Sequence, residues 1–203
     1  MEASISRLEF TRDTNGHLQA TIDGKAMLTV QAFKDFVYVD LREFYSKKNG
    51  GEILPTKRGV TLKRDEWTQL CTKSAEVRAD IIRLSNLLAA DGKPTISPII
   101  VQVTNDITVS VHAIATIATA VRVTIQKTTR KRSPQFDTAA TTSQITLTPL
   151  AWQKVFESHR TEIESIVTLL DDEASLAREK RKHDKIAEEA RCFQSFLDLS
   201  TGV

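Results

Sequence analysis

Hydrophobic and polar residues alternate along the first 62 positions in a way that predicts β-strands. The alternation is clearest in residues 36–44, where Val37, Val39 and Leu41 are separated by polar or aromatic residues. Strands are also predicted at 18–22, at 25–33 and, after a loop rich in Lys and Gly, at 59–62. Asp23-Gly24 predicts a tight hairpin turn, because both residues tolerate positive φ. These four strands predict a curved antiparallel meander, with residues 4–11 as a candidate extra strand.

A long amphipathic helix is predicted directly after this sheet, from Arg64 or Asp65 to about Leu88. Its apolar residues recur every three or four positions, with one slip around Ser74. This stripe, in which Trp67 is expected to be a core residue, consists of Trp67, Leu70, Cys71, Val77, Ile81, Leu84 and Leu88. Gly92 and Pro94 end the helix, so the segment up to Pro98 is expected to be a linker.

The same order of patterns begins again after residue 98. Residues 99–103 and 107–114 predict a second hairpin, and residues 121–125 alternate as residues 37–41 do. A basic loop and a strand at 145–147 follow, and Thr148 with Pro149 predicts the start of a second helix. Trp152 stands about 85 residues after Trp67, which indicates an internal duplication. The predicted fold is therefore α+β, with two repeats of a four-stranded antiparallel sheet followed by a long helix.

The chain is expected to divide into a first repeat at 1–92, a second and more divergent repeat at 93–170, and a charged tail at 171–203. The tail keeps helical spacing at Ile186, Ala190, Phe193 and Leu197. Two interpretations of it stay open: a solvated helical end, or a helix that docks on a partner or on the body of the protein. The basic run 178–182 has acidic neighbours on both sides, which argues against an independent DNA site there.

Composition narrows the class of protein without identifying a function. The chain has 203 residues, 40% of them hydrophobic, and a formal net charge of +2, so any nucleic-acid surface requires local segregation of charge. The two cysteines belong to no Cys-x-x-Cys pair, which makes a zinc site unexpected. No apolar run reaches the roughly 18 residues of a membrane span. Since the N-terminus also lacks an apolar signal-peptide core, we expect an intracellular soluble protein.

In one stretch of the chain, the residue types themselves are more informative about the protein's family than the periodicity is. It contains Phe33-Lys34, the strand Val39-Asp40-Leu41-Arg42-Glu43-Phe44-Tyr45, Gly51-Glu52, the run Pro55-Thr56-Lys57-Arg58-Gly59-Val60-Thr61-Leu62, and Trp67 followed by Gln69-Leu70. In this order and spacing, the stretch resembles the single-stranded-DNA-binding core of the transcriptional coactivators called positive cofactor four.

This resemblance implies an assembly and a set of contacts. Members of the family homodimerise through their helices, and the paired sheets form channels that bind DNA. A duplicated chain is then expected to form a pseudo-dimer within one polypeptide, for which covalent linkage supplies an effective concentration on the order of mM. The family's DNA contacts correspond here to Phe33, Lys34, Arg42, Tyr45, Lys57 and Arg58. Two basic positions of the family are occupied by Gln31 and Phe36.

Further candidates follow from what a single strand requires, namely cations along its phosphates and aromatic faces under its bases. In the first repeat, Lys25 and Lys47 add charge and Phe36 adds a ring. In the second repeat, the candidates are Arg122, Lys127, Arg130 and Lys131. The second repeat has Thr124 and Gln126 in place of the strand Asp and Arg, and it lacks the Pro-x-basic-basic-Gly run. We therefore expect it to bind differently, or to serve mainly as a structural partner.

The leading hypothesis is a protein that binds single-stranded or melted DNA with little sequence preference, as a coactivator-like protein of transcription. It would act in the nucleus or at an intracellular viral replication site, with the transcription machinery as a further partner. Two alternatives stay open: an interaction or structural module of the transcription or replication machinery, and an RNA-binding protein. No cofactor, metal or enzymatic activity is expected, because the four His are scattered and no nucleophile–base pair is present.

Overall fold

The computed structural model describes residues 7–47, 53–91, 97–114, 120–129 and 140–201, which form two antiparallel sheets and their helices. The first sheet has the order β1-β2-β3-β4-β5 and the second the order β6-β7-β8-β9. The first sheet consists of β1 (Thr11–Arg12), β2 (Leu18–Asp23), β3 (Ala26–Phe33), β4 (Phe36–Ser46) and β5 (Ile53–Lys63). The second consists of β6 (Ile99–Gln102), β7 (Ile107–Ala113), β8 (Val121–Thr129) and β9 (Thr141–Leu147).

The predicted fold class is confirmed, with two differences in the first sheet. The extra strand that was a candidate at residues 4–11 is only β1, which pairs Thr11 with Gln19 beside the turn that begins at Asp13, and residues 7–10 are not in a strand. Strand β5 begins at Ile53 rather than Gly59, because Phe44, Tyr45 and Ser46 continue β4 beyond a bulge and pair with Pro55, Leu54 and Ile53. We call this extension, residues 44–46 of β4 and 53–58 of β5, the β4–β5 arm. The alternation of apolar and polar residues could not reveal it, since a two-stranded ribbon needs no apolar residue at every second position.

The helical segments after each sheet are bent at matching places. The first sheet is followed by α1 (Arg64–Thr72) and α2 (Ser74–Asp91), which are separated at Lys73. The second is followed by α3 (Pro149–Gln153), the π-helical turn η1 (Lys154–Ser158) and α4 (Arg160–Thr201). The slip predicted around Ser74 is therefore a real break in the helix.

The π-helical turn accounts for a change of register between the two repeats. Trp67 and Trp152 are both buried and 85 positions apart, whereas buried Val77 corresponds to buried Ile163, which is 86 positions further on. A π turn holds one more residue than the α turn it replaces. This extra residue restores the inward direction of the apolar stripe of α4.

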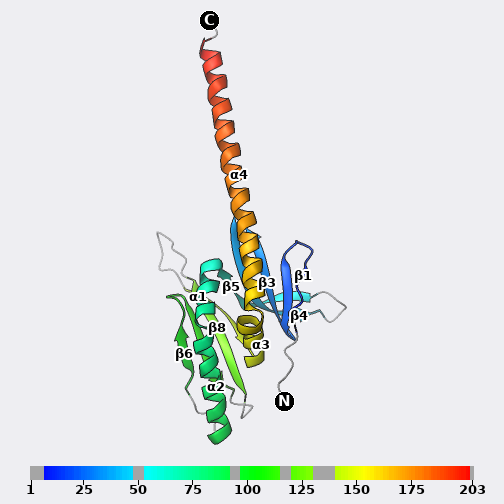
Figure 1. Cartoon of the computed structure of the whole chain (residues 1–203), viewed down its shortest axis with the longest axis vertical. Helices are drawn as coiled ribbons and strands as arrows, with labels where there is room; N and C mark the ends of the chain where they lie inside the picture. Colours follow the sequence, from blue (N-terminus) through cyan, green and yellow to red (C-terminus); the bar gives the residue numbers. More distant parts are fainter. Residues whose placement is uncertain (1–6, 48–52, 92–96, 115–119, 130–139, 202–203) are drawn as a thin grey trace.

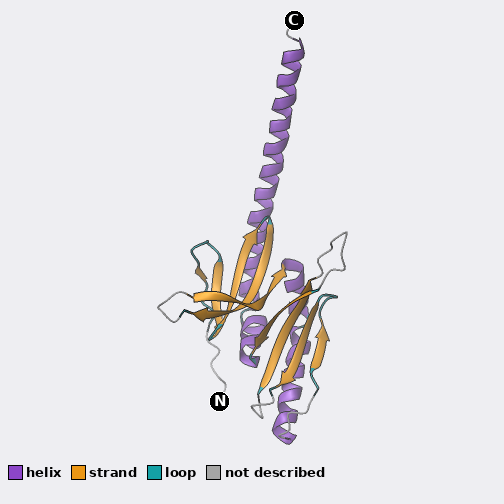
Figure 2. Cartoon of the chain, turned by 180° about the vertical axis from the view of Figure 1, so that it is seen from behind, coloured by secondary structure: helices purple, strands orange, loops and turns teal. Residues whose placement is uncertain are grey.

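The helices are exchanged between the two sheets (Figures 1 and 2). Helix α1 contacts β4 and β5, and α3 contacts β8 and β9, so each first turn packs on its own sheet. Beyond the bend, α2 contacts β6, β7 and β8, while α4 contacts β3 and β4. Each long helix thus covers the sheet of the other repeat, and neither sheet is closed by its own half alone.

Aromatic side chains lie where the two repeats meet. The Phe156 ring stacks on Trp152 at 4.1 Å between ring centroids and on Trp67 at 5.2 Å. All three residues belong to one hydrophobic core that includes buried residues of both sheets, such as Leu41 and Val123. The expectation that Trp67 is a core residue is confirmed, and its counterpart Trp152 is buried as well.

Helix α4 continues far beyond the body of the protein. It runs without interruption through residue 171, where a tail was expected to begin, and its C-terminal part stands away from both sheets (Figure 1). Residues 179–193 are exposed along their whole length. None of the helices in the described part of the chain is long and apolar enough to cross a membrane.

Candidate nucleic-acid interface

Two aromatic rings are displayed at the end of the β3–β4 hairpin. Phe33 and Phe36 pair directly across the strands, and 58% and 56% of their surfaces are exposed. The turn between them consists of Lys34 and Asp35, which have φ values of 47° and 71°. Two consecutive residues with positive φ match the twist of the strands and give the tightest connection. The Lys34 Nζ lies 5.4 Å from the Phe33 ring centroid, so a cation is held beside an open ring.

The β4–β5 arm carries the second group of predicted residues. Tyr45 is 48% exposed near the end of β4, and Lys57 and Arg58 are exposed on β5. Arg58 is 3.7 Å from the Glu43 carboxylate but keeps 76% of its side chain exposed. A pair that is this exposed holds the guanidinium only weakly. Both cations therefore remain available to an anionic ligand.

A hollow of about 370 Å³ brings two predicted residues together from different hairpins. Lys25, in the β2–β3 turn, and Tyr45, on β4, line it together with Met27 and Phe44. Lys47 is exposed just beyond the end of β4. Positive charge and an aromatic face thus meet at this edge of the first sheet.

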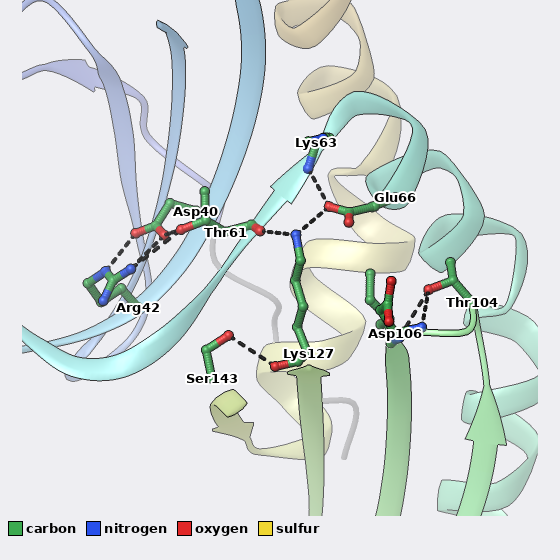
Figure 3. A network of polar contacts seen from close by, with 10 residues as sticks. Asp40, Arg42, Thr61, Lys63, Glu66, Thr104, Asp106, Lys127 and Ser143 are labelled. Atoms are coloured by element: carbon green, nitrogen blue, oxygen red, sulfur yellow. Dashed lines mark hydrogen bonds and ion pairs between the residues drawn. The ribbon is translucent and has the colours of Figure 1, made fainter. Parts of the chain in front are cut away.

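Arg42 lies in a second hollow, of about 680 Å³, on the face of the first sheet that is turned away from the core. Its Nε and Nη2 donate to the two oxygens of Asp40, each at 2.9 Å, and its Nη1 donates to the carbonyl of Thr56 at 3.0 Å. Hydrogen bonding to Asp40 raises the pKa of Arg42. Thr61 also donates to Asp40, at 2.5 Å (Figure 3). This network fixes the guanidinium and neutralises much of its charge, so the floor of the hollow is less cationic than the sequence suggested.

The second sheet lacks this charged network. A hydrogen bond between Thr124 and Thr146, at 2.9 Å, occupies the place of the Asp40–Thr61 pair. Arg122 is half-buried and donates to the carbonyl of Val121. Arg130 and Lys131, which were predicted to bind nucleic acid, lie outside the described residues. The departure of the second repeat from the family pattern thus corresponds to a more neutral outer face.

Lys127 lies at the junction of the two repeats (Figure 3). Its ammonium donates to the carbonyl of Thr61 at 2.9 Å and to the Glu66 carboxylate at 2.7 Å, and only 16% of the side chain is exposed. Glu66 also accepts from the backbone N–H of Lys63 at the start of α1. From the sequence, Lys127 was predicted to lie in a basic loop and to bind nucleic acid. The structure gives it a role in joining the second sheet to the first helix, because the pattern could not show that Glu66 faces it.

Two basic residues near Phe36 were not selected from the sequence. Arg178 and Arg181 of α4 reach the β3–β4 hairpin end. The acidic residues around the run 178–182 argued against a binding role there. Only the packing of α4 on β3 and β4 brings these side chains to positions 35 and 36, which are more than 140 residues away in sequence.

These features define a sheet-and-helix module with open aromatic rings and cations on one repeat. Residues 20–73 match the family described as Transcriptional Coactivator p15 (PC4). An RNA polymerase II transcriptional coactivator of Drosophila melanogaster is 38% identical over 63 residues, covering 31% of this chain and 56% of that protein. A putative RNA polymerase II transcriptional coactivator of Caenorhabditis elegans is 29% identical over 59 residues, covering 29% of this chain and 48% of that protein. Residues 20–73 are thus PC4-like, and the chain spans about half the length of these curated relatives.

One solved structure, described as "Crystal structures of trypanosoma bruciei MRP1/MRP2", is also similar to this chain. The identity is 11%, the TM-score is 0.30, and the alignment covers 76% of this chain and 83% of that chain. A similarity this weak carries no information about the function.

Among the described residues, no group of three His, Cys, Asp or Glu is placed so that it could hold a metal ion.

Proposed function

We propose that this protein binds single-stranded DNA with little sequence preference and acts as a transcriptional coactivator-like protein. The observation that carries the proposal is the pair of open rings at the β3–β4 hairpin end, with Lys34 between them. The match of residues 20–73 to a coactivator family supports the same conclusion. The coactivator names of the two relatives support a role in the nucleus, through binding rather than catalysis.

Stacking explains why an unpaired strand is the preferred ligand. Every base has an open π-face once it leaves a duplex, and stacking on a protein ring contributes about 1–3 kcal/mol per base. Phe33, Phe36 and Tyr45 offer such rings, each with about half of its surface accessible. Bases within a duplex are already stacked, so duplex DNA would use only the cations.

The cations supply the part of the affinity that does not depend on sequence. Lys25, Lys34, Lys57 and Arg58 are all exposed on the first repeat. Each one that contacts a phosphate of a single strand steepens the dependence of log K on log salt by about 0.7. Because the whole chain has a net charge of only +2, binding through this surface depends on its local concentration of charge.

We assign the two repeats different duties. Residues 1–92 provide the binding surface, and residues 93–170 complete the shared core and hold the long helices in place. The part of α4 that projects from the body, within 171–203, is the candidate for a second function, separate from DNA binding. Ile186 and Phe193 are 63% and 65% exposed on it, which favours docking of a protein partner such as a component of the transcription machinery.

Fluorescence anisotropy with labelled oligo-dT, oligo-U and a duplex of equal length tests the proposal. The expected order of affinity places oligo-dT well above duplex. Phe33→Ala with Phe36→Ala should weaken oligo-dT binding about 10- to 100-fold. The matched control is Leu169→Ala with Ile82→Ala, since these apolar side chains are equally exposed on helices.

Charge reversal tests the cationic arm separately. Lys57→Glu with Arg58→Glu should weaken binding and flatten its salt dependence. Lys185→Glu with Arg191→Glu, on the projecting part of α4, makes the same change of charge away from the sheet. Equal or tighter binding to duplex would contradict the preference for single strands, and tighter binding of oligo-U would favour RNA as the ligand.

A further inference from the structure

Helix α4 brings two arginines to the rings at the β3–β4 hairpin end. The Arg178 guanidinium carbon lies 6.0 Å from the centroid of the Phe36 ring. Arg181, one turn further along, forms an ion pair with Asp35 in the turn itself. Figure 1 shows α4 alongside β3 before it leaves the body of the protein. Helix α4, which begins in the second repeat and continues into the tail, thus contributes charge to the exposed rings of the first repeat.

We propose that Arg178 and Arg181 complete a composite site, together with Phe33, Lys34 and Phe36, that binds one base and its flanking phosphates of a single DNA strand. The inference rests on the proposed function and extends it. It adds ligand-contacting residues from the part of α4 beyond residue 170, which lies outside the matched segment 20–73.

Arg178 is held in a position suited to this task. Its Nη2 donates to Ser175 Oγ at 3.1 Å, and its Nε is buried without a hydrogen-bond partner in the described part of the chain. No carboxylate among the described residues forms an ion pair with it, so its positive charge is not cancelled locally. A guanidinium above a ring gains cation–π energy and restrains the ring. Phe36 nevertheless keeps 56% of its surface open for a base.

Arg181 differs because it is paired in the unbound protein. The Asp35 carboxylate neutralises it and also repels phosphates that approach Lys34. The pair is largely exposed, with 60% of the Arg181 side chain and 30% of the Asp35 side chain accessible, so a phosphate can compete for the arginine at small cost. Asp35 therefore limits the affinity of the composite site, and removing its charge should release Arg181 for the ligand.

The test measures the affinity of the full chain for oligo-dT over a range of salt concentrations. Arg178→Ala should weaken binding about 5- to 20-fold, and Arg178 and Arg181 together should account for a loss of up to about 1.4 in the salt slope. Lys180→Ala is the matched control, because it removes one charge from the same basic run but points about 160° away from Arg178 and about 100° away from Arg181. We expect it to change affinity by less than about 2-fold.

A second variant should change the affinity for oligo-dT in the opposite direction. Asp35→Asn keeps a residue that tolerates positive φ and should tighten oligo-dT binding about 2- to 5-fold. Asp184→Asn, further along α4, controls for the change in net charge and should have little effect. Thermal unfolding of each variant verifies that the fold is intact.

The two hypotheses fail in different ways. If the unaltered protein does not bind oligo-dT, the proposed function is wrong. If it binds, but Arg178→Ala and Arg181→Ala behave like Lys180→Ala, or the salt slope of both is unchanged, only the composite site is overturned. A loss of affinity in Asp35→Asn would equally overturn it.

Discussion

The hairpin end of β3 and β4 contains a residue whose backbone is strained and whose side chain the proposed function would use. Lys34 has a φ of 47°, a region in which a side chain with a Cβ is strained by about 1 kcal/mol or more and Gly is not. Its ammonium is nonetheless held beside the Phe33 ring, where a phosphate could reach it. A conformationally unfavourable residue that carries a useful charge is typical of a binding site.

Lys34→Gly should therefore stabilise the protein while weakening its binding of DNA. We expect a gain of about 0.5–1 kcal/mol, or about 2–4 °C in Tm, together with a salt slope lower by about 0.7. Calorimetry and anisotropy measure the two effects. Lys25→Gly is the control, because Lys25 follows Gly24 in the preceding turn and does not have positive φ. It should not stabilise, and stabilisation by both variants would refute the strain argument.

The two cysteines should differ strongly in reactivity. Cys71 is buried in the core, and burial raises the pKa of its thiol to about 12, with Arg160 opposing the shift. Cys192 is exposed on α4, and neither residue forms a disulfide. A thiol reagent at pH 8 should modify Cys192 alone in the native protein and both residues after denaturation, as mass spectrometry would show.

The raised pKa of Cys71 also sets a dependence of stability on pH. The folded state favours the protonated thiol, so its contribution is complete below the unfolded pKa and declines as pH rises towards 12. The unfolding free energy should therefore fall with pH above about 9. Cys71→Ala should reduce this slope, and an unchanged slope would contradict the assignment.

The surroundings of a side chain could be predicted from the sequence only where the residues that it contacts are close to it along the chain. The strand residues Val37, Val39 and Leu41 were predicted to face inward, and all are buried. Lys127 was predicted to lie in a basic loop, but it lies in β8 and contacts Glu66 of the other repeat, a contact that spacing along the chain could not show. Arg178 was not selected for a similar reason, since its ring partner is distant in sequence.

At the scale of elements, the bends after Trp67 and Trp152 decide the architecture. Amphipathic spacing predicted both helices and the slip at Ser74, but a stripe of apolar residues does not reveal which sheet it covers. The exchange of α2 and α4 between the two sheets therefore could not be predicted from the sequence. It requires that the helix turns away from its own sheet, which Lys73 achieves in the first repeat and η1 in the second.

Deleting Ser158 from the π turn tests this interpretation. The deletion would rotate α4 by about 100° relative to α3 and turn Ile163 and Val167 away from the core. Loss of each large apolar side chain from a core costs about 2–5 kcal/mol, so we expect a large drop in Tm or failure to fold.

Deletion of Asp184 is the matched control, because it also removes a single residue, but from the part of α4 where every described side chain is exposed. Its Tm should stay close to that of the intact chain. A mild effect of the Ser158 deletion, seen by circular dichroism, would mean that the π turn does not set the register of α4.

At the scale of the whole molecule, exchange of helices makes the two repeats dependent on each other. Contacts between them include the ion pairs Arg64–Asp171 and Arg78–Glu157 and the stacking of Phe156 on Trp67. The main benefit of duplication is then that one chain supplies both sheets and both covering helices. This would replace the association of two copies by a connection within the chain.

Separating the repeats should expose that dependence. Residues 1–91 and 97–203, produced as two chains in one cell, should copurify as a 1:1 complex, since α2 covers β6 to β8 and α4 covers β3 and β4. The complex should melt below the intact chain, and its Tm should rise with concentration, because association is no longer intramolecular. Residues 1–91 alone should self-associate or unfold, whereas the intact chain should elute as one copy. A folded monomer of 1–91 would show that the first repeat closes its own core, and an intact chain that is always a dimer would show that duplication did not replace association.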